Sequence, residues 1–128
     1  MQLVIRTQGS CVGEEGEWSY AIHEKSPEGE TEFVHSESGE SGGTTTRQMK
    51  LMAILKALSY AKASDYLTSI LLISDCEWCT KCIKREFDCA SDDEFKRHKV
   101  SRGYVQYLQE IWWTLSGMQV RFQVETLE

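Results

Sequence analysis

The feature of this sequence that most constrains its fold is an uninterrupted apolar run at residues 70–73, between Ser69 and Ser74. Such a run is typical of a strand inside a parallel sheet, with both of its faces covered. Parallel strands need a long crossover connection, which is usually a helix. A helix ending near residue 63 is predicted just before the run, because Thr45 and Gln48 form a capping-box pattern. The chain is therefore predicted to be an α/β protein.

Three short strands are predicted ahead of this helix, and the tight turns between them indicate an antiparallel meander. The strands lie at residues 2–9, 18–22 and 31–35, with turns at 13–16 and 27–29. The polar stretch 37–43, rich in glycine and serine, is predicted to be a loop.

After the apolar strand we expect a short helix, a charged segment, a second long helix and a last strand at residues 118–124. The long helix has one apolar face: Tyr104, Leu108, Ile111 and Leu115. This order predicts a mixed five-stranded sheet, in which three antiparallel strands are followed by parallel strands, flanked by helices. At 128 residues it forms one domain, residues 1–128.

Charge is distributed unevenly along the chain. Residues 1–43 contain two basic and nine acidic side chains, a net of −7, whereas residues 44–128 have a net of +1. Because lysine and arginine make phosphate contacts, any nucleic-acid surface is expected in the second part. No apolar run approaches the ~18 residues of a membrane span, so no membrane partner is expected. The five cysteines lack the spacing of a disulfide framework, which favours reduced thiols and a cytoplasmic protein.

Three motifs occur at matching places in this order of elements. They are Thr7-Gln8-Gly9-Ser10-Cys11 on the first strand, Thr46-Arg47-Gln48-Met49-Lys50-Leu51-Met52-Ala53 on the helix, and Ile73-Ser74-Asp75-Cys76 after the apolar strand. Together they resemble the ribonuclease H family, whose segments read Thr-Asp-Gly-Ser, Asn-Arg-Met-Glu-Leu-Met-Ala and Ser-Thr-Asp-Ser. The last strand, around Phe122, is similar as well. The resemblance covers nearly the whole chain and implies a ribonuclease H-like fold.

The resemblance also implies where a catalytic metal site would lie. Gln8 stands in place of an aspartate and Lys50 in place of a glutamate, and only Asp75 keeps its carboxylate. The sequence ends at Glu128, ahead of the family's last helix and final aspartate, and the family's histidine-bearing loop has no counterpart. Two-metal hydrolysis needs two divalent ions about 4 Å apart, and Mg²⁺ needs carboxylate ligands.

The charges at the three matched positions, 0, +1 and −1, sum to zero. We therefore expect no metal site and no cofactor, with at most weak Mg²⁺ or Mn²⁺ binding at Asp75. The Lys50 ammonium is expected to take the place of the metal and to pair with Asp75.

Cysteines follow Asp75 at a spacing that has two interpretations: Cys76, Cys79 and Cys82, with Cys89 beyond. Thiolates at such spacing can converge on a metal ion. On a helix, however, an apolar stripe would form from Cys76, Cys79, Ile83 and Phe87. Cysteine behaves there as a small buried hydrophobe, so we favour core packing.

A basic cluster ahead of the second long helix is a candidate nucleic-acid contact: Lys96, Arg97, Lys99 and Arg102. Some family members carry a basic protrusion there that grips a duplex; the other interpretation is a solvated loop. By resemblance, Ser10 contacts ribose or phosphate, or it caps the turn after the first strand. The neighbours Trp112 and Trp113 point about 100° apart on a helix, so one is expected in the core and the other is a candidate for exposure. For both we favour packing in the core or at its boundary.

The leading hypothesis is a catalytically inactive ribonuclease H-like domain, a pseudoenzyme with a degenerate active site. It would act as a nucleic-acid-binding or interaction module, with a duplex bound through residues 96–102 or a protein as its partner. One alternative is a nuclease with an altered metal site that cleaves RNA in RNA–DNA hybrids, using Asp75 with Glu77 or Glu125. Another is a protein-assembly module with no nucleic-acid role, which the acidic first part favours.

Overall fold

The computed structural model describes residues 2–63, 69–84, 102–116 and 122–126, and its elements follow the predicted order βββαβααβ. The strands are β1 (Gln2–Val12), β2 (Glu15–Lys25), β3 (Thr31–Gly42), β4 (Ser69–Ser74) and β5 (Phe122–Thr126). The helices are α1 (Thr46–Ala63), α2 (Glu77–Lys84) and α4 (Arg102–Ser116).

The five strands form one mixed sheet in the order β3-β2-β1-β4-β5. β2 is antiparallel to both β1 and β3, whereas β4 is parallel to both β1 and β5. This arrangement confirms the predicted α/β class and the division into antiparallel and parallel strands. The last strand is described over Phe122–Thr126, and residues 118–121 of the predicted strand lie outside the described residues.

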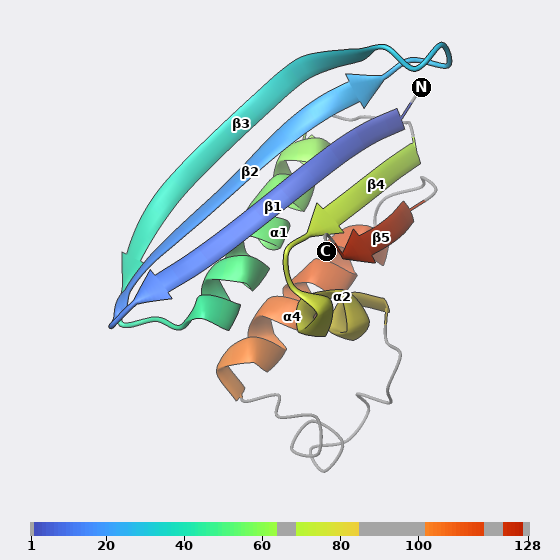
Figure 1. The fold of residues 1–128 in the computed structure, drawn as a ribbon. Helices are drawn as coiled ribbons and strands as arrows, with labels where there is room; N and C mark the ends of the chain where they lie inside the picture. The colour runs from blue at the N-terminus through green and yellow to red at the C-terminus, as the bar shows by residue number, and fades with distance from the viewer. Residues whose placement is uncertain (1, 64–68, 85–101, 117–121, 127–128) are drawn as a thin grey trace.

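The described helices lie on one side of the sheet (Figure 1). α1 lies against β1 and β2 and packs on α4, so that the core forms between helices and sheet. Its largest fully buried side chains include Leu3, Ile5, Ile22, Leu58, Ile70, Leu72, Leu108 and Ile111. The prediction that β4 is covered on both faces is wrong: Ile70 and Leu72 are buried, but Leu71 and Ile73 are half-buried. Those two side chains face away from the described helices.

The stretch 37–43 was predicted to be a loop, but β3 continues through it to Gly42. It pairs with β2 residue by residue, with Trp18 opposite Gly39. A Cβ on Gly39 would lie 2.5 Å from the indole ring of Trp18, so the tryptophan occupies the space that a side chain would need. Glycine is therefore required at position 39, and glycine in a strand makes the sequence there resemble a loop.

The turn between β1 and β2 is shorter than predicted, because the strands are joined by Gly13 and Glu14 alone. Gly13 has a φ of 64°, a conformation that glycine adopts without the strain that a side chain introduces. Gly16 belongs to β2, and a Cβ there would meet the side chains of Met49 and Thr44. The start of α1 therefore packs closely against this hairpin.

α1 begins with the predicted capping box. The Gln48 backbone N–H donates to Thr45 Oγ1 at 3.3 Å, and the Thr45 N–H donates to Gln48 Oε1 at 3.1 Å. Two backbone donors that have no partner inside the helix are thereby satisfied. The cap fixes where the helix starts, and so fixes the place of Lys50 in its first turns.

The prediction that both adjacent tryptophans pack in the core or at its boundary is confirmed for Trp112 and wrong for Trp113. Trp112 is partly buried against the core, whereas Trp113 is 72% exposed. The Lys62 ammonium lies 4.6 Å from the centre of the Trp113 ring. None of the described helices combines the length and the apolar character needed to cross a bilayer.

Candidate functional site

Gly9 sets how closely α1 approaches β1. A Cβ on this residue would lie 2.4 Å from the backbone nitrogen of Lys50 and 2.6 Å from the carbonyl carbon of Met49. Real Cβ atoms do not come so near to backbone, so the contact requires glycine. It brings the backbone at residue 50 directly against the end of β1.

β1 extends well beyond its parallel neighbour. The register pairs Thr7 with Ser74, the last residue of β4, while β1 continues to Val12. Asp75 is the first residue after β4 and therefore lies beside Gln8. Two of the three positions matched to the family's metal ligands are brought together in this way.

Lys50 reaches the same place from α1. Its Nζ atom lies 2.7 Å from Asp75 Oδ2, and the two side chains are 16% and 31% exposed. The predicted pairing of Lys50 with Asp75 is thus confirmed. An ammonium at this distance donates a charge-assisted hydrogen bond to the carboxylate. Asp75 is therefore neutralised by a partner from the protein itself.

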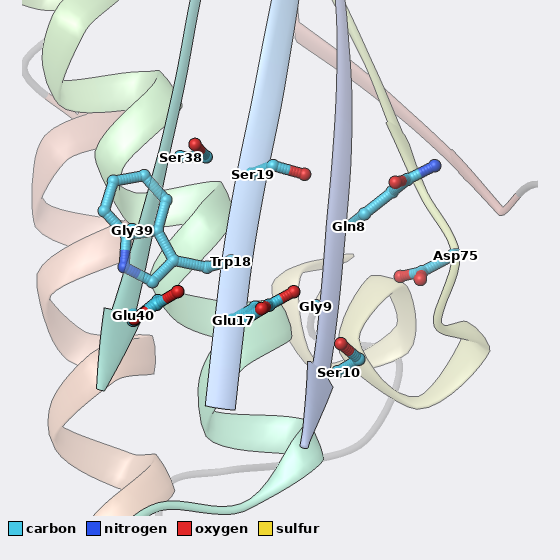
Figure 2. Close-up of a pocket in the computed structure, with 10 residues that line it drawn as sticks. All are labelled: Gln8, Gly9, Ser10, Glu17, Trp18, Ser19, Ser38, Gly39, Glu40 and Asp75. Carbon is cyan, nitrogen blue, oxygen red and sulfur yellow. The ribbon is translucent and has the colours of Figure 1, made fainter. Parts of the chain in front are cut away.

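A shallow groove of about 690 Å³ opens beside this ion pair, on the sheet face opposite the helices. Its polar side chains come from the ends of three neighbouring strands and from Asp75: Gln8, Ser10, Glu17, Ser19, Ser38 and Glu40. Figure 2 shows Gln8 and Asp75 at one rim and Glu40 at the other. Ser10 is among the residues that line the groove.

The groove is acidic. Glu17 and Glu40 are opposite each other in the β2–β3 register, and no lysine or arginine is among the lining residues. Sequence reasoning missed these two glutamates, because their meeting depends on β3 reaching residue 42. Across the described part of the chain, no group of three or more His, Cys, Asp or Glu side chains is arranged to hold a metal ion.

Cys76 caps the amino terminus of α2. Its sulfur accepts a hydrogen bond from the Cys79 backbone N–H at 3.4 Å, and its own N–H donates to Ser74 Oγ at 3.2 Å. The hydrogen bond from the Cys79 side chain is the largest cause that lowers the pKa of the Cys76 thiol to about 6. Partial burial opposes this shift, whereas the Cys79 N–H and the Lys50 charge add to it.

The core interpretation of the cysteines is confirmed for Cys79, which is fully buried among apolar side chains. Ile83 of the predicted stripe is buried too. Cys76 is half-buried and packs against the same core, and its sulfur also caps the helix. The side chain of Cys82, and Cys89 as a whole, lie outside the described residues.

A family model for RNase H matches residues 1–126. The chain belongs to the RNase H family. A search of curated proteins found no match.

Solved structures share this RNase H fold. The N-terminal RNase H domain of rv2228c from Mycobacterium tuberculosis, fused to maltose-binding protein, is similar with a TM-score of 0.79 and 8% identity, over 100% of this chain and 88% of that one. RNase H1 of the archaeon Halobacterium salinarum NRC-1 gives a TM-score of 0.64 and 18% identity, over 99% and 86% of the two chains. LC11-RNase H1 in complex with RNA/DNA hybrid has a TM-score of 0.63 and 14% identity, over 98% of this chain and 84% of that one.

Most of the remaining predicted site residues of this RNase H domain lie outside the part of the chain that the structure describes. Lys96, Arg97 and Lys99 lie outside the described residues, and so does the side chain of Arg102 at the start of α4. Glu77 begins α2 and is exposed. The side chain of Glu125 in β5 is not among those described. The described site therefore consists of Gln8, Ser10, Glu17, Glu40, Asp75 and Lys50.

Proposed function

We propose that this RNase H domain does not hydrolyse nucleic acid by a two-metal mechanism and serves instead to bind a nucleic-acid duplex. The absence of two-metal hydrolysis is proposed from the 2.7 Å ion pair between Lys50 and Asp75, beside the neutral Gln8. A divalent ion at Asp75 would have to displace this ammonium or lie next to it. Like charges about 4 Å apart repel by several kcal/mol at a protein surface. The pair therefore disfavours Mg²⁺ and Mn²⁺.

Two observations support the duplex as the ligand. LC11-RNase H1 has been solved with an RNA/DNA hybrid, and the foamy viral protease-reverse transcriptase with double-stranded DNA; both share this fold. In the present chain, basic side chains are concentrated in the second part, at Lys96, Arg97, Lys99 and Arg102. Phosphate contacts would come from these residues, because no lysine or arginine is among those that line the acidic groove.

The test measures binding and cleavage on one labelled RNA–DNA hybrid. We expect binding that weakens as salt rises, and no cleavage with Mg²⁺ or Mn²⁺. Replacing Lys96, Arg97 and Lys99 by alanine together should weaken binding and reduce the slope of its salt dependence by about one for each phosphate-binding cation removed. Lys25→Ala is the matched control, because Lys25 is an exposed cation in the acidic first part. Absence of binding at low salt would overturn the duplex role.

Cleavage has its own control. Metal-dependent hydrolysis that Asp75→Asn abolishes would contradict the non-hydrolytic proposal and support the altered-site nuclease. Thermal unfolding supplies a second measurement, because an ion that binds only the folded state raises the melting temperature. We expect Mg²⁺ to leave the melting temperature of the natural sequence unchanged and to raise that of a Q8D/K50E double variant, which has three carboxylates.

A protein-interaction role is the second candidate, and the acidic groove favours it. Glu17, Glu40 and Asp75 line one concave surface with no cation among the lining residues, so a cationic protein segment would complement it. The hybrid-binding test separates the two roles. If the acidic groove binds protein and the basic residues bind the duplex, Glu17→Gln and Glu40→Gln should not weaken duplex binding, because removing carboxylates reduces repulsion of phosphate. Loss of duplex binding in these variants would contradict this assignment of the two surfaces.

A further inference from the structure

Two cysteines face each other at the start of α2, in a Cys-x-x-Cys arrangement. Cys76 precedes the first helical residue, Glu77, and Cys79 is the third residue of the helix. Side chains three positions apart lie on the same face, with Cβ atoms about 5–6 Å apart. A disulfide requires about 3.5–4.5 Å between Cβ atoms. A small closing of the first turn would therefore suffice to join them.

The two sulfurs already interact. The Cys79 side chain hydrogen-bonds to the Cys76 sulfur, and the Cys79 backbone N–H lies 3.4 Å from the same atom. Trp78, between the cysteines, lies under the Arg47 guanidinium, 4.4 Å from the ring centre, which ties this turn to α1. Core packing accounts for the burial of Cys79, but it does not require the sulfur of Cys76 to face Cys79.

The two thiols differ in access. Cys76 is half-buried, whereas Cys79 is 0% exposed. An oxidant from solution would therefore meet Cys76 first. The thiolate is the form of cysteine that reacts with peroxides. A sulfur at a helix amino terminus that accepts a backbone N–H, as Cys76 does, is favoured in that form.

We infer that Cys76 and Cys79 form a reversible dithiol–disulfide couple, in which a peroxide oxidises Cys76 and Cys79 resolves it. The Cys76 sulfur attacks one peroxide oxygen, the O–O bond breaks, and hydroxide leaves and is protonated to water. Cys76 is then a sulfenic acid. The Cys79 sulfur attacks the Cys76 sulfur, the S–S bond forms, and the S–O bond breaks. The departing hydroxyl takes the Cys79 proton and leaves as a second water. The two cysteines lose two electrons, which reduce the peroxide; a dithiol reductant reverses the change by thiol–disulfide exchange.

The sequence offers a direct test. Trypsin cleaves after Lys62 and Lys81, which releases a fragment of residues 63–81 that contains Cys76 and Cys79 and no other cysteine. After treatment of the folded protein with hydrogen peroxide and alkylation of free thiols, we expect this fragment as a single peptide, unalkylated and two hydrogen masses lighter. Dithiothreitol should restore both alkylation sites. A fragment that stays fully alkylated, or one joined to the peptide of residues 82–84 through Cys82, would overturn the proposal.

Two variants test the assigned order of the steps. In Cys79→Ser the resolving thiol is absent, so a sulfenic acid should persist at Cys76 and be trapped there by dimedone. In Cys76→Ser, Cys79 should stay reduced, because it is buried. Cys11→Ser is the control: its thiol donates to the carbonyl oxygens of Gly13 and Thr44 and has no cysteine partner among the described residues. Dimedone labelling of Cys79 rather than Cys76 would contradict the order of attack.

Discussion

At the scale of single residues, a glycine determines the geometry of the site, because it has no side chain. Gly9 allows the backbone of α1 to touch β1, and this contact places Lys50 where it can reach Asp75. The ion pair itself is partly exposed, so it adds little to stability, about 0–1 kcal/mol. Its importance is chemical, because it occupies the carboxylate that a metal would need.

Replacing Gly9 by alanine should separate α1 from β1. The new Cβ would lie 2.4 Å from backbone that cannot rotate away, and overpacking of this kind costs about 1–3 kcal/mol. Urea denaturation should show a loss in this range. Gly42→Ala is the matched control, since Gly42 is also in a strand and a Cβ there meets nothing within 4 Å. A Gly9→Ala variant as stable as Gly42→Ala would contradict the close approach.

The reactivity of Cys76 should depend on pH in a lower range than that of an ordinary thiol. With a pKa of about 6, its alkylation rate should fall as pH drops through 6, whereas a cysteine of pKa ~8.5 is already protonated there. At pH 6 we expect Cys76 to react about tenfold faster than such a thiol, allowing for the weaker nucleophilicity of acidic thiols. Peptide mass spectrometry after timed iodoacetamide treatment measures this rate.

Cys79→Ala is the matched variant, because it removes the hydrogen bond that contributes most to the shift. Its alkylation profile should move to higher pH. The same shift has a consequence for stability: the thiol pKa is lower in the folded state than in the unfolded chain. The stabilisation is therefore complete above the unfolded pKa and is lost as pH falls towards 6.

At the scale of elements, the sheet carries a like-charge pair that its fold does not need. Glu17 on β2 is opposite Glu40 on β3, and like charges in directly opposed positions destabilise a pair of strands. Both side chains are exposed at the groove. A destabilising pair kept at a concave surface is consistent with a role in binding a cationic partner.

Glu40→Gln should stabilise the protein by about 0.5 kcal/mol at low salt, because it relieves this cross-strand repulsion. The gain should shrink as salt screens the charges. Denaturation midpoints at low and high salt provide the measurement. Glu28→Gln makes the same charge change in the exposed turn between β2 and β3, without an opposite strand residue. Equal gains in both variants would assign the effect to net charge instead of the pair.

The elements that sequence predicted best are those set by local patterns. The capping box at Thr45 and Gln48 fixes the start of α1, and the apolar run fixes β4, so both follow from neighbours along the chain. The second half of β3 could not be predicted in this way, because Gly39 is needed beneath Trp18, and that contact comes from another strand. The burial of both faces of β4 was predicted wrongly for a similar reason, because burial of a strand depends on where helices from other parts of the chain pack.

At the scale of the whole molecule, the site combines predicted and unpredicted parts. The pairing of Lys50 with Asp75 followed from matching motifs, since a family resemblance transfers relative positions that no local pattern contains. The acidic groove required the full register of β1, β2 and β3, which a single sequence does not supply. The two-layer arrangement leaves this sheet face accessible beside the ion pair (Figures 1 and 2).

The contact at Gly9 has a consequence for how such a domain can change over evolution. Because backbone atoms hold β1 against α1, positions 8 and 50 remain neighbours of Asp75 whichever side chains they carry. A carboxylate, an amide or an ammonium can be exchanged there without rebuilding the scaffold. A change in the charges around Asp75 then needs only one or two substitutions, whereas a side chain at Gly9 would displace the backbone that holds the two positions together.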